Sequence, residues 1–495
     1  MKYFDLPKLS TALALIVLAS IFITLSSRSV WMDEAMLLKN IMEIKAPAEF
    51  IAPMPYYDQA EPVLASVFFK TIMAVFHYDT RPLRFSVLTA SLVMLMPMWL
   101  LYRKYRWGLF VLLVALIGNS FSTGFQMTEL KHYFLELSGS FLAVLAIWKA
   151  DETRQMAWLV IGAAVISLLG FSTLLVSGGL LGYAVLWFLL RPDDSRRLLN
   201  GVLFVCAVII VGFSYFYMKH LTIYQLGNYP QYQNGSVTHS LYVLFDALLG
   251  AYGKALFISS VVSSLALLAF HDRGFTFKLN LFFCTMVLMV IAGKVIGFYP
   301  VTYPRHVIWL VPFSLVICSV AILEFTASSS STFKILGWVL FTVLSLQALK
   351  ACYKNINGDN YEYTDNAALY GYVAHLSPAT ILVHPNAQPS LEFYRLHEPD
   401  LNKQHFILAR DERTKVRVPA MEGEEMRGWI DDLFRQRPTG SFYFLTSHLD
   451  LQAGETEQGA MLESAIRRFN CTYNSAFAVN DAQLLLMECG APHEP

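Results

Sequence analysis

The sequence predicts a polytopic α-helical membrane protein with about eleven transmembrane helices, followed by a small α/β domain at the C-terminus. Hydrophobic residues make up 55% of the 495 residues, only 15% are charged, and the mean hydropathy is +0.46. A water-soluble fold cannot hide that much apolar surface, so the composition favours an integral membrane protein. The 37 basic and 37 acidic residues balance, and nothing in the net charge indicates a nucleic-acid partner.

Apolar runs of roughly 20 residues, long enough to cross about 30 Å of hydrocarbon, define the individual helices. The stretch 156–190 is too long for one crossing, since at 1.5 Å per residue it would reach about 52 Å. It is therefore expected to form two helices that turn near residues 170–173. The expected crossings are 9–27, 84–102, 107–124, 132–149, the two halves of 156–190, 199–218, 254–270, 279–297, 305–324 and 333–352.

Residues 61–77 are also apolar, but the segment is short and carries Lys70. If it crossed the membrane, the basic loop at 102–106 and the basic loops after it would lie opposite the basic N-terminus, against the positive-inside rule. We therefore expect an interfacial helix within one external loop, residues 28–83. The N-terminus is then cytoplasmic and the C-terminal domain external, which in a bacterial inner membrane means periplasmic.

Under this topology the residues with reactive side chains gather in the external connections, while the internal connections are short and basic. Asp33 and Glu34 follow the first helix directly. The external segments of interest are 31–35, 58–62, 126–133, 219–253 and 298–306. A site for chemistry is therefore expected on the external face.

The ordered set of these motifs resembles the GT-C superfamily of membrane glycosyltransferases, within it the branch that contains protein O-mannosyltransferases and the lipid A aminoarabinose transferase. That branch has an Asp-Glu pair after the first helix, an acidic residue and a proline before an interfacial helix, and a charged, tyrosine-containing turn that opens a later helix. The matching segments here are 33–34, 61–62 and 129–133. Residues 81–106 and 303–319 also resemble helices of this family, and the resemblance covers roughly residues 10–325.

The resemblance implies an enzyme that takes a sugar from a polyprenyl-phosphate carrier and inverts its anomeric centre in one displacement. The attacking hydroxyl loses its proton as it bonds to carbon, so a carboxylate has to act as general base. Asp33 is expected to be this base, with Glu34 as the second catalytic carboxylate. The leaving phosphate needs cations rather than a second acid. Arg305 is the preferred ligand because its fork matches phosphate oxygens, and it is assisted by His306, Lys131 and Lys294.

Further residues are expected to contact the substrates, some of them as aromatic surfaces on which a sugar stacks. They are Trp31, Glu61, Glu129, His132, Tyr133 and Tyr303. No cofactor is expected. Some relatives bind a divalent metal through an acidic residue and a histidine, so Glu61 with His220 or His239 is kept as an alternative, although no metal-ligand spacing supports it.

Each of these residues also has a structural alternative. Asp33 could serve only as the N-cap of the helix that follows, with Glu34 in its first turn. Glu61 could serve only to begin the interfacial helix. The basic and aromatic residues could be anchors at the membrane boundary with snorkelling side chains; these are Lys131, His132, Tyr133, Lys294 and Arg305.

The predicted function is therefore a glycosyltransferase that moves a hexosyl or pentosyl group onto a cell-envelope acceptor at the periplasmic face. The acceptor, whether O-antigen, lipid A or its core, another glycan or protein, stays open, as does the sugar. One alternative is a transporter or flippase of lipid-linked sugars, which should show charges at mid-membrane and internal repeats. The other is a non-catalytic envelope assembly protein, which would tolerate loss of Asp33.

Residues 353–495 have a different composition and predict a small α/β domain with a partly parallel sheet. Helices are expected at 365–376, 422–436 and 457–469, and strands at 379–385, 404–410 and 441–447. The domain has no GxGxxG motif, P-loop or metal-ligand cluster. A role in support or acceptor docking is expected.

Two of the six cysteines, Cys471 and Cys489, are each nine residues from Asn480. The two arms have strand-like patterns, so they predict a hairpin in which these cysteines face each other across the ladder. The external compartment is oxidising, and a disulfide can persist there. We therefore predict a Cys471–Cys489 disulfide that stabilises the hairpin.

Overall fold

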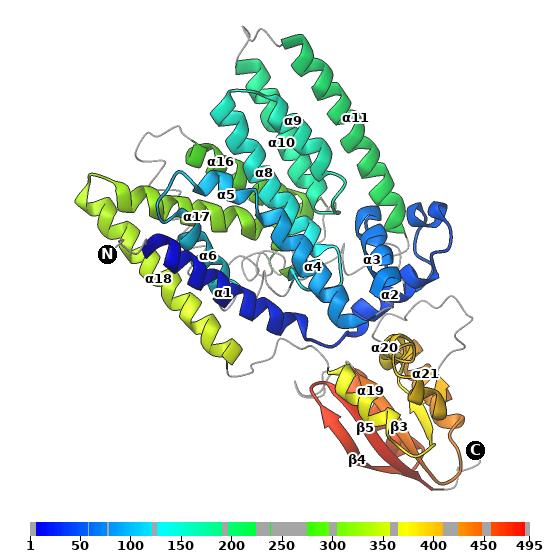
Figure 1. The fold of residues 1–495 in the computed structure, drawn as a ribbon. Coiled ribbons are helices and arrows are strands. Elements are labelled where there is room, and N and C mark those ends of the chain that lie inside the picture. Colours follow the sequence, from blue (N-terminus) through cyan, green and yellow to red (C-terminus); the bar gives the residue numbers. More distant parts are fainter. Residues whose placement is uncertain are drawn as a thin grey trace.

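The computed structural model describes residues 6–57, 59–76, 79–120, 126–190, 197–223, 238, 275–296, 304–356, 365–408, 424–447 and 457–490. In these residues, eight helices are long and apolar enough to cross a membrane, and three further apolar helices are shorter. The helices form one body, and the C-terminal sheet lies at one end of it (Figure 1). The predicted crossing at 254–270 lies outside the described residues, so the total of eleven stays a prediction.

The apolar helices follow the predicted crossings closely. Pro97 interrupts the second crossing, which consists of α4 (Thr80–Leu95) and α5 (Met98–Tyr102), because proline has no N–H for the helical ladder. The other helices of the body are α1 (Leu6–Ser26), α6 (Gly108–Gly118), α8 (Tyr133–Thr153), α9 (Ala157–Ile166), α10 (Thr173–Leu190), α11 (Arg197–Leu221), α16 (Phe275–Val295), α17 (Val311–Ala327) and α18 (Ser331–Ile356).

The turn between α9 and α10 falls where the sequence predicts it, and a carboxylate of α8 explains its position. Glu136 Oε1 accepts from the backbone N–H of Ser172 at 2.8 Å. A Cβ atom on Gly170 would lie only 2.4 Å from Glu136 Cγ. Glycine is therefore required at this point, because the turn packs directly on the Glu136 side chain.

Three short elements connect α1 to α4: α2 (Met32–Glu43), the 3₁₀ helix η1 (Pro47–Ile51) and α3 (Val63–Phe76). The 14 residues of α3 span about 21 Å, which is less than the hydrocarbon core of a bilayer. This length agrees with an interfacial helix at 61–77, and its position at the membrane surface stays a prediction.

The centre of the body is formed by α8 and α17. In their most apolar stretches, 89% and 94% of the residues are buried, against 17% for α11. Figure 1 accordingly shows α11 at the edge of the body. The exposed apolar residues of α11 are suited to lipid rather than to water.

The C-terminal domain is a five-stranded mixed sheet with helices on both faces. The strand order is β2-β1-β3-β5-β4, with β2, β1 and β3 parallel and β3, β5 and β4 antiparallel. The strands are β1 (Thr380–Val383), β2 (His405–Leu408), β3 (Ser441–Ser447), β4 (Cys471–Val479) and β5 (Ala482–Cys489). The predicted strands and the partly parallel arrangement are confirmed.

Successive residues of β1 show which helices cover which face of the sheet. Ile381 and Val383 belong to a core with α19 (Asn366–Ala374) and α20 (Gln388–Tyr394), whereas Leu382 packs in a core with α21 (Glu424–Arg435) and α22 (Glu457–Arg468). This alternation is the period of two of a β-strand. Three short elements are not predicted from the sequence: α20 and the 3₁₀ helices η3 (Pro385–Ala387) and η4 (Pro399–Lys403).

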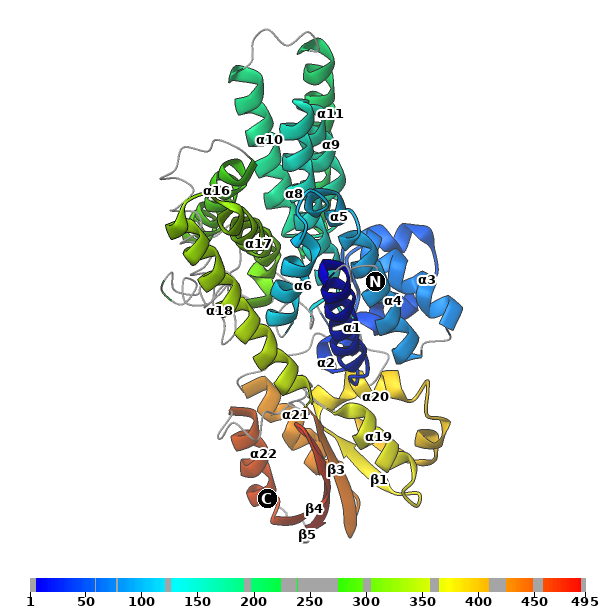
Figure 2. The same ribbon diagram turned by 60° about the vertical axis from the view of Figure 1, so that its left-hand side comes forward.

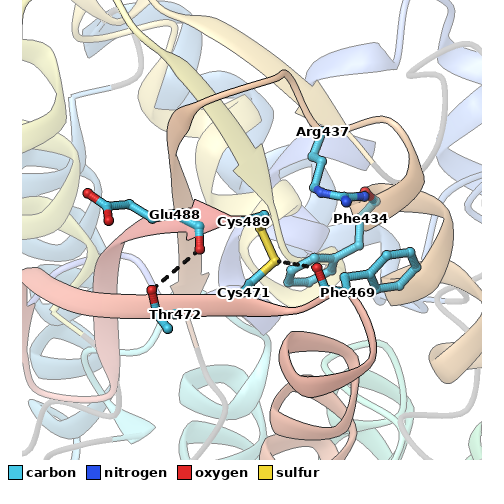
Figure 3. The surroundings of a disulfide bond; sticks show 7 residues. All are labelled: Phe434, Arg437, Phe469, Cys471, Thr472, Glu488 and Cys489. Carbon is cyan, nitrogen blue, oxygen red and sulfur yellow. Dashed lines mark hydrogen bonds between the residues drawn. A yellow bond between two sulfur atoms is a disulfide. The ribbon is translucent and has the colours of Figure 1, made fainter. Parts of the chain in front are cut away.

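The predicted hairpin is formed by β4 and β5, and Cys471 and Cys489 are paired in its register and joined by a disulfide (Figure 3). The turn has two residues, since Val479 pairs with Ala482. Regular pairing from this turn would set Cys471 opposite residue 490. A bulge between Ser475 and Phe477 shifts the ladder by one residue and brings the two cysteines opposite each other.

The C-terminal domain and the external elements share one hydrophobic core. Residues of α2, α3 and α4, such as Leu38 and Phe69, belong to the same buried cluster as Tyr370 of α19 and Leu391 of α20. Figure 2 shows α2 directly above α20 and α19. The domain is therefore packed against the helical body and not merely linked to it.

Candidate functional site

Asp33 lies where three distant segments of the chain meet. Its Oδ2 atom accepts from Lys131 Nζ at 3.0 Å and from Arg305 Nη1 at 3.2 Å. Asp33 is in the first turn of α2, Lys131 directly precedes α8, and Arg305 is in η2 (Pro304–Leu310), which leads into α17. The side chains of Asp33, Lys131 and Arg305 are 15%, 8% and 22% exposed, so their charges are partly shielded from water and interact more strongly than surface pairs.

The indole ring of Trp31 lies beside both cations. Lys131 Nζ is 5.8 Å and Arg305 Cζ is 6.0 Å from the ring centre, within the range of cation–π interactions. The sequence analysis places these residues at one site from the predicted topology, the family resemblance and their chemistry, and the structure brings all four together. We call Trp31, Asp33, Lys131 and Arg305 the Asp33 cluster.

Glu34 points away from the Asp33 cluster and binds Arg84 of α4. Arg84 Nη1 and Nη2 donate to Glu34 Oε1 and Oε2 at 2.7 and 2.6 Å. The same carboxylate accepts from the backbone N–H groups of Leu130 at 2.8 Å and Trp31 at 3.3 Å. Both oxygens are thus occupied in a buried pair. These contacts give Glu34 a supporting position that faces away from the Asp33 cluster, and its catalytic role stays a prediction.

The structural alternative for Asp33 is corrected. Helix α2 begins at Met32, so Asp33 is its second residue and Trp31 is the N-cap. The N–H of Trp31 is bound by Glu34. The capping role therefore belongs to Glu34, and Asp33 instead accepts from Lys131 and Arg305.

Arg84 is the residue of this site that the sequence analysis does not single out. Besides Glu34, it donates to the backbone carbonyls of Arg28 at 3.0 Å, Ser29 at 2.6 Å and Thr128 at 3.0 Å. It thereby ties the segment after α1 to the segment before α8. Its signal in the sequence is a positive charge near the start of an apolar crossing, which is unfavourable in a membrane unless it is paired.

Glu129 is a buried carboxylate next to the Asp33 cluster. It is 1% exposed, and within the described part of the chain neither of its carboxylate oxygens accepts a hydrogen bond. Burial raises the pKa of Glu129 to about 7, although the charges of Lys131 and Arg305 act in the opposite direction. A buried carboxylate with two open acceptors is suited to bind hydroxyl groups of a ligand.

A second group of polar residues links α3 to α8. His132 Nδ1 lies 2.8 Å from Glu61 Oε2, and His132 Nε2 lies 3.7 Å from Glu136 Oε1. Burial disfavours the charged imidazolium, but the two carboxylates outweigh this effect and raise the pKa of His132 above its ordinary value. Glu61 thus does more than begin α3, because it holds this helix against α8.

The C-terminal domain holds the backbone just before Trp31. Tyr394 Oη accepts from the N–H of Val30 at 3.0 Å, and Asn366 Nδ2 donates to the carbonyl of Val30 at 2.9 Å. Ser29 Oγ lies 3.3 Å from Asp365 Oδ1. Both backbone groups of Val30 are therefore fixed by this domain, three residues before Asp33.

The structure places the remaining predicted site residues that it describes in different elements. Tyr133 begins α8 beside His132, with 4.7 Å between the ring centres. His306 follows Arg305 in η2. Lys294 is buried in the last turn of α16, and no hydrogen bond or ion pair in the described residues joins it to the Asp33 cluster. Tyr303 lies outside the described residues.

The described residues contain no group of three histidine, cysteine, aspartate or glutamate side chains arranged to hold a metal ion. His220 is in the last turn of α11 and makes no hydrogen bond or ion pair with Glu61 in that part of the chain. His239 lies outside it. The metal alternative therefore gains no support from the described residues.

These contacts define what the site can do chemically. One carboxylate and two cations lie within hydrogen-bonding distance of each other beside an aromatic ring. The cations can bind a phosphate in place of Asp33, because Oδ2 occupies the position that a phosphate oxygen would take. The carboxylate can then accept a proton from a hydroxyl group. The arrangement is therefore chemically suited to proton transfer and to binding a phosphate group.

Comparison with known proteins bears on the fold. No protein-family model and no curated protein matches the sequence. The structure of ArnT from Cupriavidus metallidurans aligns over 97% of both chains, with a TM-score of 0.56 in the apo state and 0.53 bound to undecaprenyl phosphate, at 11% identity. The Archaeoglobus fulgidus oligosaccharyltransferase aligns with 94% of this chain and 72% of its own, at 11% identity and a TM-score of 0.42. The similarity to ArnT is one of fold, and it confirms the predicted polytopic helical fold with a small C-terminal sheet domain.

Proposed function

We propose that this protein is an inverting glycosyltransferase that moves a sugar from a polyprenyl-phosphate carrier to a cell-envelope acceptor on the periplasmic face of the inner membrane. The observation that carries the proposal is the Asp33 cluster, in which one carboxylate oxygen is bound by Lys131 and Arg305. A related observation is that ArnT, which has this fold, has been crystallised with undecaprenyl phosphate. A phosphate on a polyprenyl chain fits two cations at the ends of apolar helices.

In the proposed reaction, the donor phosphate takes Lys131 and Arg305 from Asp33, and the freed carboxylate becomes the general base. The acceptor hydroxyl gives its proton to Asp33 and forms a bond to the anomeric carbon. The bond from that carbon to the phosphate oxygen breaks, and its electron pair leaves with the polyprenyl phosphate. Arg305 and Lys131 stabilise the additional negative charge on the phosphate.

The other predicted residues have supporting roles in this proposal. Glu129 binds hydroxyl groups of the sugar or the acceptor, and Trp31 and Tyr133 provide surfaces for the sugar ring. His306 assists the phosphate ligands. Glu34 and Arg84 hold Asp33 in place. No metal or other cofactor takes part, and the sugar and the acceptor are left open.

The test is an Asp33→Asn variant, with lipid-linked glycans and envelope polysaccharide compared between cells that carry wild type, variant or no gene. The amide is nearly the same shape as the carboxylate but accepts protons poorly, so transfer should fall by about 10³-fold with normal expression. The control is Asp79→Asn at the N-cap of α4, where Asp79 accepts from the N–H of Arg81 and asparagine caps equally well.

Arg305 provides an independent arm of the same test. Arg305→Lys keeps the charge but loses the fork, so turnover should fall, and Arg305→Ala should also weaken donor binding. Near-normal transfer by Asp33→Asn would contradict the proposed mechanism. A flippase would instead show transport of the lipid-linked sugar without any sugar transfer, and that result would favour the transporter alternative.

A further inference from the structure

A cavity of about 720 Å³ opens at the end of the helical body opposite to the Asp33 cluster. Two helices establish this position. α8 begins beside Lys131, and its last turns line the cavity with Trp148, Asp151 and Glu152. α17 begins after Arg305, and Glu324 near its end lines the same cavity. Figures 1 and 2 show α5, α8, α16 and α17 side by side around this region.

The acidic residues of the cavity already have partners. Asp151 is paired with Lys278, and Glu152 with Lys149 at 2.5 Å. Glu324 accepts from the hydroxyl groups of Tyr105 at 3.2 Å and Thr276 at 3.1 Å. The carboxylates of the lining are therefore bound from within the protein.

The two cations that line the cavity, Arg103 and Lys104, differ from these carboxylates. Within the described residues, neither Arg103 nor Lys104 has an acidic partner. Each lies beside an aromatic ring: Arg103 is 5.8 Å from the Trp99 ring centre and Lys104 is 4.8 Å from that of Tyr105. Among the described residues, the lining itself has two cations and three carboxylates. Lys149 and Lys278, which lie beside the cavity, pair with Glu152 and Asp151. Arg103 and Lys104 are therefore the charges of the lining that have no opposite charge beside them in the described residues, and an anion is their complementary ligand.

Four residues of the cavity wall are apolar. Leu100, Trp148, Phe275 and Phe277 line it, and the polar and apolar parts meet at the ends of membrane helices. A small soluble anion would use only the cations. An amphiphile with a charged head and apolar chains would use both parts.

We propose that this cavity binds the phosphate group of an anionic phospholipid, with Arg103 and Lys104 as phosphate ligands and the apolar wall against the lipid chains. The positive-inside rule puts this end of the body at the cytoplasmic leaflet, which carries anionic lipids. Bound lipid would hold the ends of α5, α8, α16 and α17 together. The site is separate from the Asp33 cluster and does not depend on the proposed function.

The test is native mass spectrometry of the delipidated full-length protein titrated with phosphatidylglycerol. Wild type should retain this lipid, and R103Q/K104Q should bind it about 30-fold more weakly, or roughly fivefold for each charge. The matched control is Arg106→Gln, which removes an exposed cation of the same loop that does not line the cavity, and its affinity should stay within about twofold of wild type.

Two further ligands identify the source of the phosphate. Phosphatidylcholine, with the same chains and no net charge, should bind at least about tenfold more weakly, and sn-glycerol 3-phosphate should not compete. If glycerol phosphate binds as tightly as the lipid and loses affinity in R103Q/K104Q, the ligand is a soluble phosphate and the lipid assignment is overturned. Equal binding of phosphatidylglycerol by wild type and R103Q/K104Q overturns the site itself.

A second variant keeps the test decisive if R103Q/K104Q does not fold. Leu100→Trp places a larger side chain in the cavity and leaves both cations in place. It should lose phosphatidylglycerol binding as well, because the chains can no longer enter. Unchanged binding by a folded Leu100→Trp would contradict the proposed position of the lipid.

Discussion

At the scale of single residues, Asp33 and Glu129 show how one site gives two carboxylates different properties. Asp33 is bound by two cations, whereas Glu129 is buried without a hydrogen-bond partner in the described residues. An ion pair favours the charged carboxylate, and burial favours the protonated one. Two carboxylates whose environments favour opposite protonation states are typical of sites that move protons.

Glu129→Gln should make the protein more stable above pH 7 and less active. The raised pKa of about 7 means that folding favours the protonated form. The wild type therefore loses stability as the pH rises from about 4.5 to 7, by up to about 3 kcal/mol. Glutamine removes this penalty. Thermal unfolding of both proteins in detergent at pH 5 and pH 8 measures it.

The control for this prediction is Glu463→Gln, because Glu463 is exposed and paired with Arg467. It should change neither stability nor activity. If Glu129→Gln is less stable than wild type at pH 8, the carboxylate has a structural partner and its role in ligand binding is wrong. If wild-type activity falls as the pH drops below about 7 and Glu129→Gln removes both the activity and this acidic limb of the profile, Glu129 rather than Asp33 is the general base.

The chemistry of single residues is visible in the sequence, but their contacts are not. Asp33, Lys131 and Arg305 are predicted from residue type and topology, although 98 and 272 positions separate Asp33 from its partners. Glu34 is next to Asp33 in the sequence, but the two side chains do not share partners, because successive residues on a helix point about 100° apart. Glu34 therefore reaches Arg84 and not the cations, and no sequence pattern reveals that choice.

At the scale of secondary-structure elements, the pair of Glu61 and His132 fastens the short helix α3 to the central helix α8. Lys131, Glu136 and Glu61 are the charged residues that act on His132. A histidine with a raised pKa contributes stability that is complete below its unfolded value of about 6.5 and is lost as the pH rises through the folded value.

Glu61→Gln should therefore destabilise the protein most at low pH. We expect a loss of about 3 kcal/mol at pH 6, because the variant leaves a buried imidazolium without its partner, and a smaller loss at pH 9. Thermal unfolding at both values measures the difference. The control is Glu43→Gln, since Glu43 pairs with Lys39 at the surface. A loss that does not depend on pH would show that His132 is neutral throughout.

The disulfide between β4 and β5 should contribute to the stability of the C-terminal domain. Eighteen positions separate the two cysteines, and closing a loop of this size contributes about 3 kcal/mol. C471A/C489A should lower the stability of the C-terminal domain by this amount, whereas Cys284→Ala, at an exposed free cysteine, should not. Figure 3 shows Phe434 and Phe469 beside the bond, and the apolar core to which they belong should keep the variant folded.

Intact mass after alkylation without reductant tests the bond directly. Only Cys206, Cys284, Cys318 and Cys352 are free, so these alone should be modified in the denatured protein. Modification of Cys471 and Cys489 in protein purified from the membrane would refute the disulfide. It would also weaken the placement of the C-terminal domain in an oxidising compartment.

Long elements are easier to predict than short ones. Hydropathy locates the membrane helices because each is a long apolar run, and the strands of the small domain follow from their β-branched and aromatic residues. The helices α20, η3 and η4 are missed because three to seven residues do not establish a helical period. The bulge at Ser475–Phe477 is missed because an extra residue in a strand leaves no regular signal.

At the scale of the whole molecule, the direction of the chain through the membrane is the main prediction that remains to be tested. Single cysteines in a background without the free cysteines should react with an impermeant thiol reagent from the periplasm near Asp79 and Gln126. A cysteine near Lys104 should not react. Labelling near Lys104 but not near Asp79 would show that residues 61–77 cross the membrane after all.

The two bonds from the C-terminal domain to Val30 have a consequence for biosynthesis. The N-terminal segment leaves the ribosome first, yet Asn366 and Tyr394 are synthesised more than 300 residues later, as their positions in the sequence show. The backbone before Asp33 therefore lacks its partners until most of the chain has been inserted and exported. A chain interrupted during synthesis would therefore reach the membrane with its helices in place but without a completed Asp33 cluster.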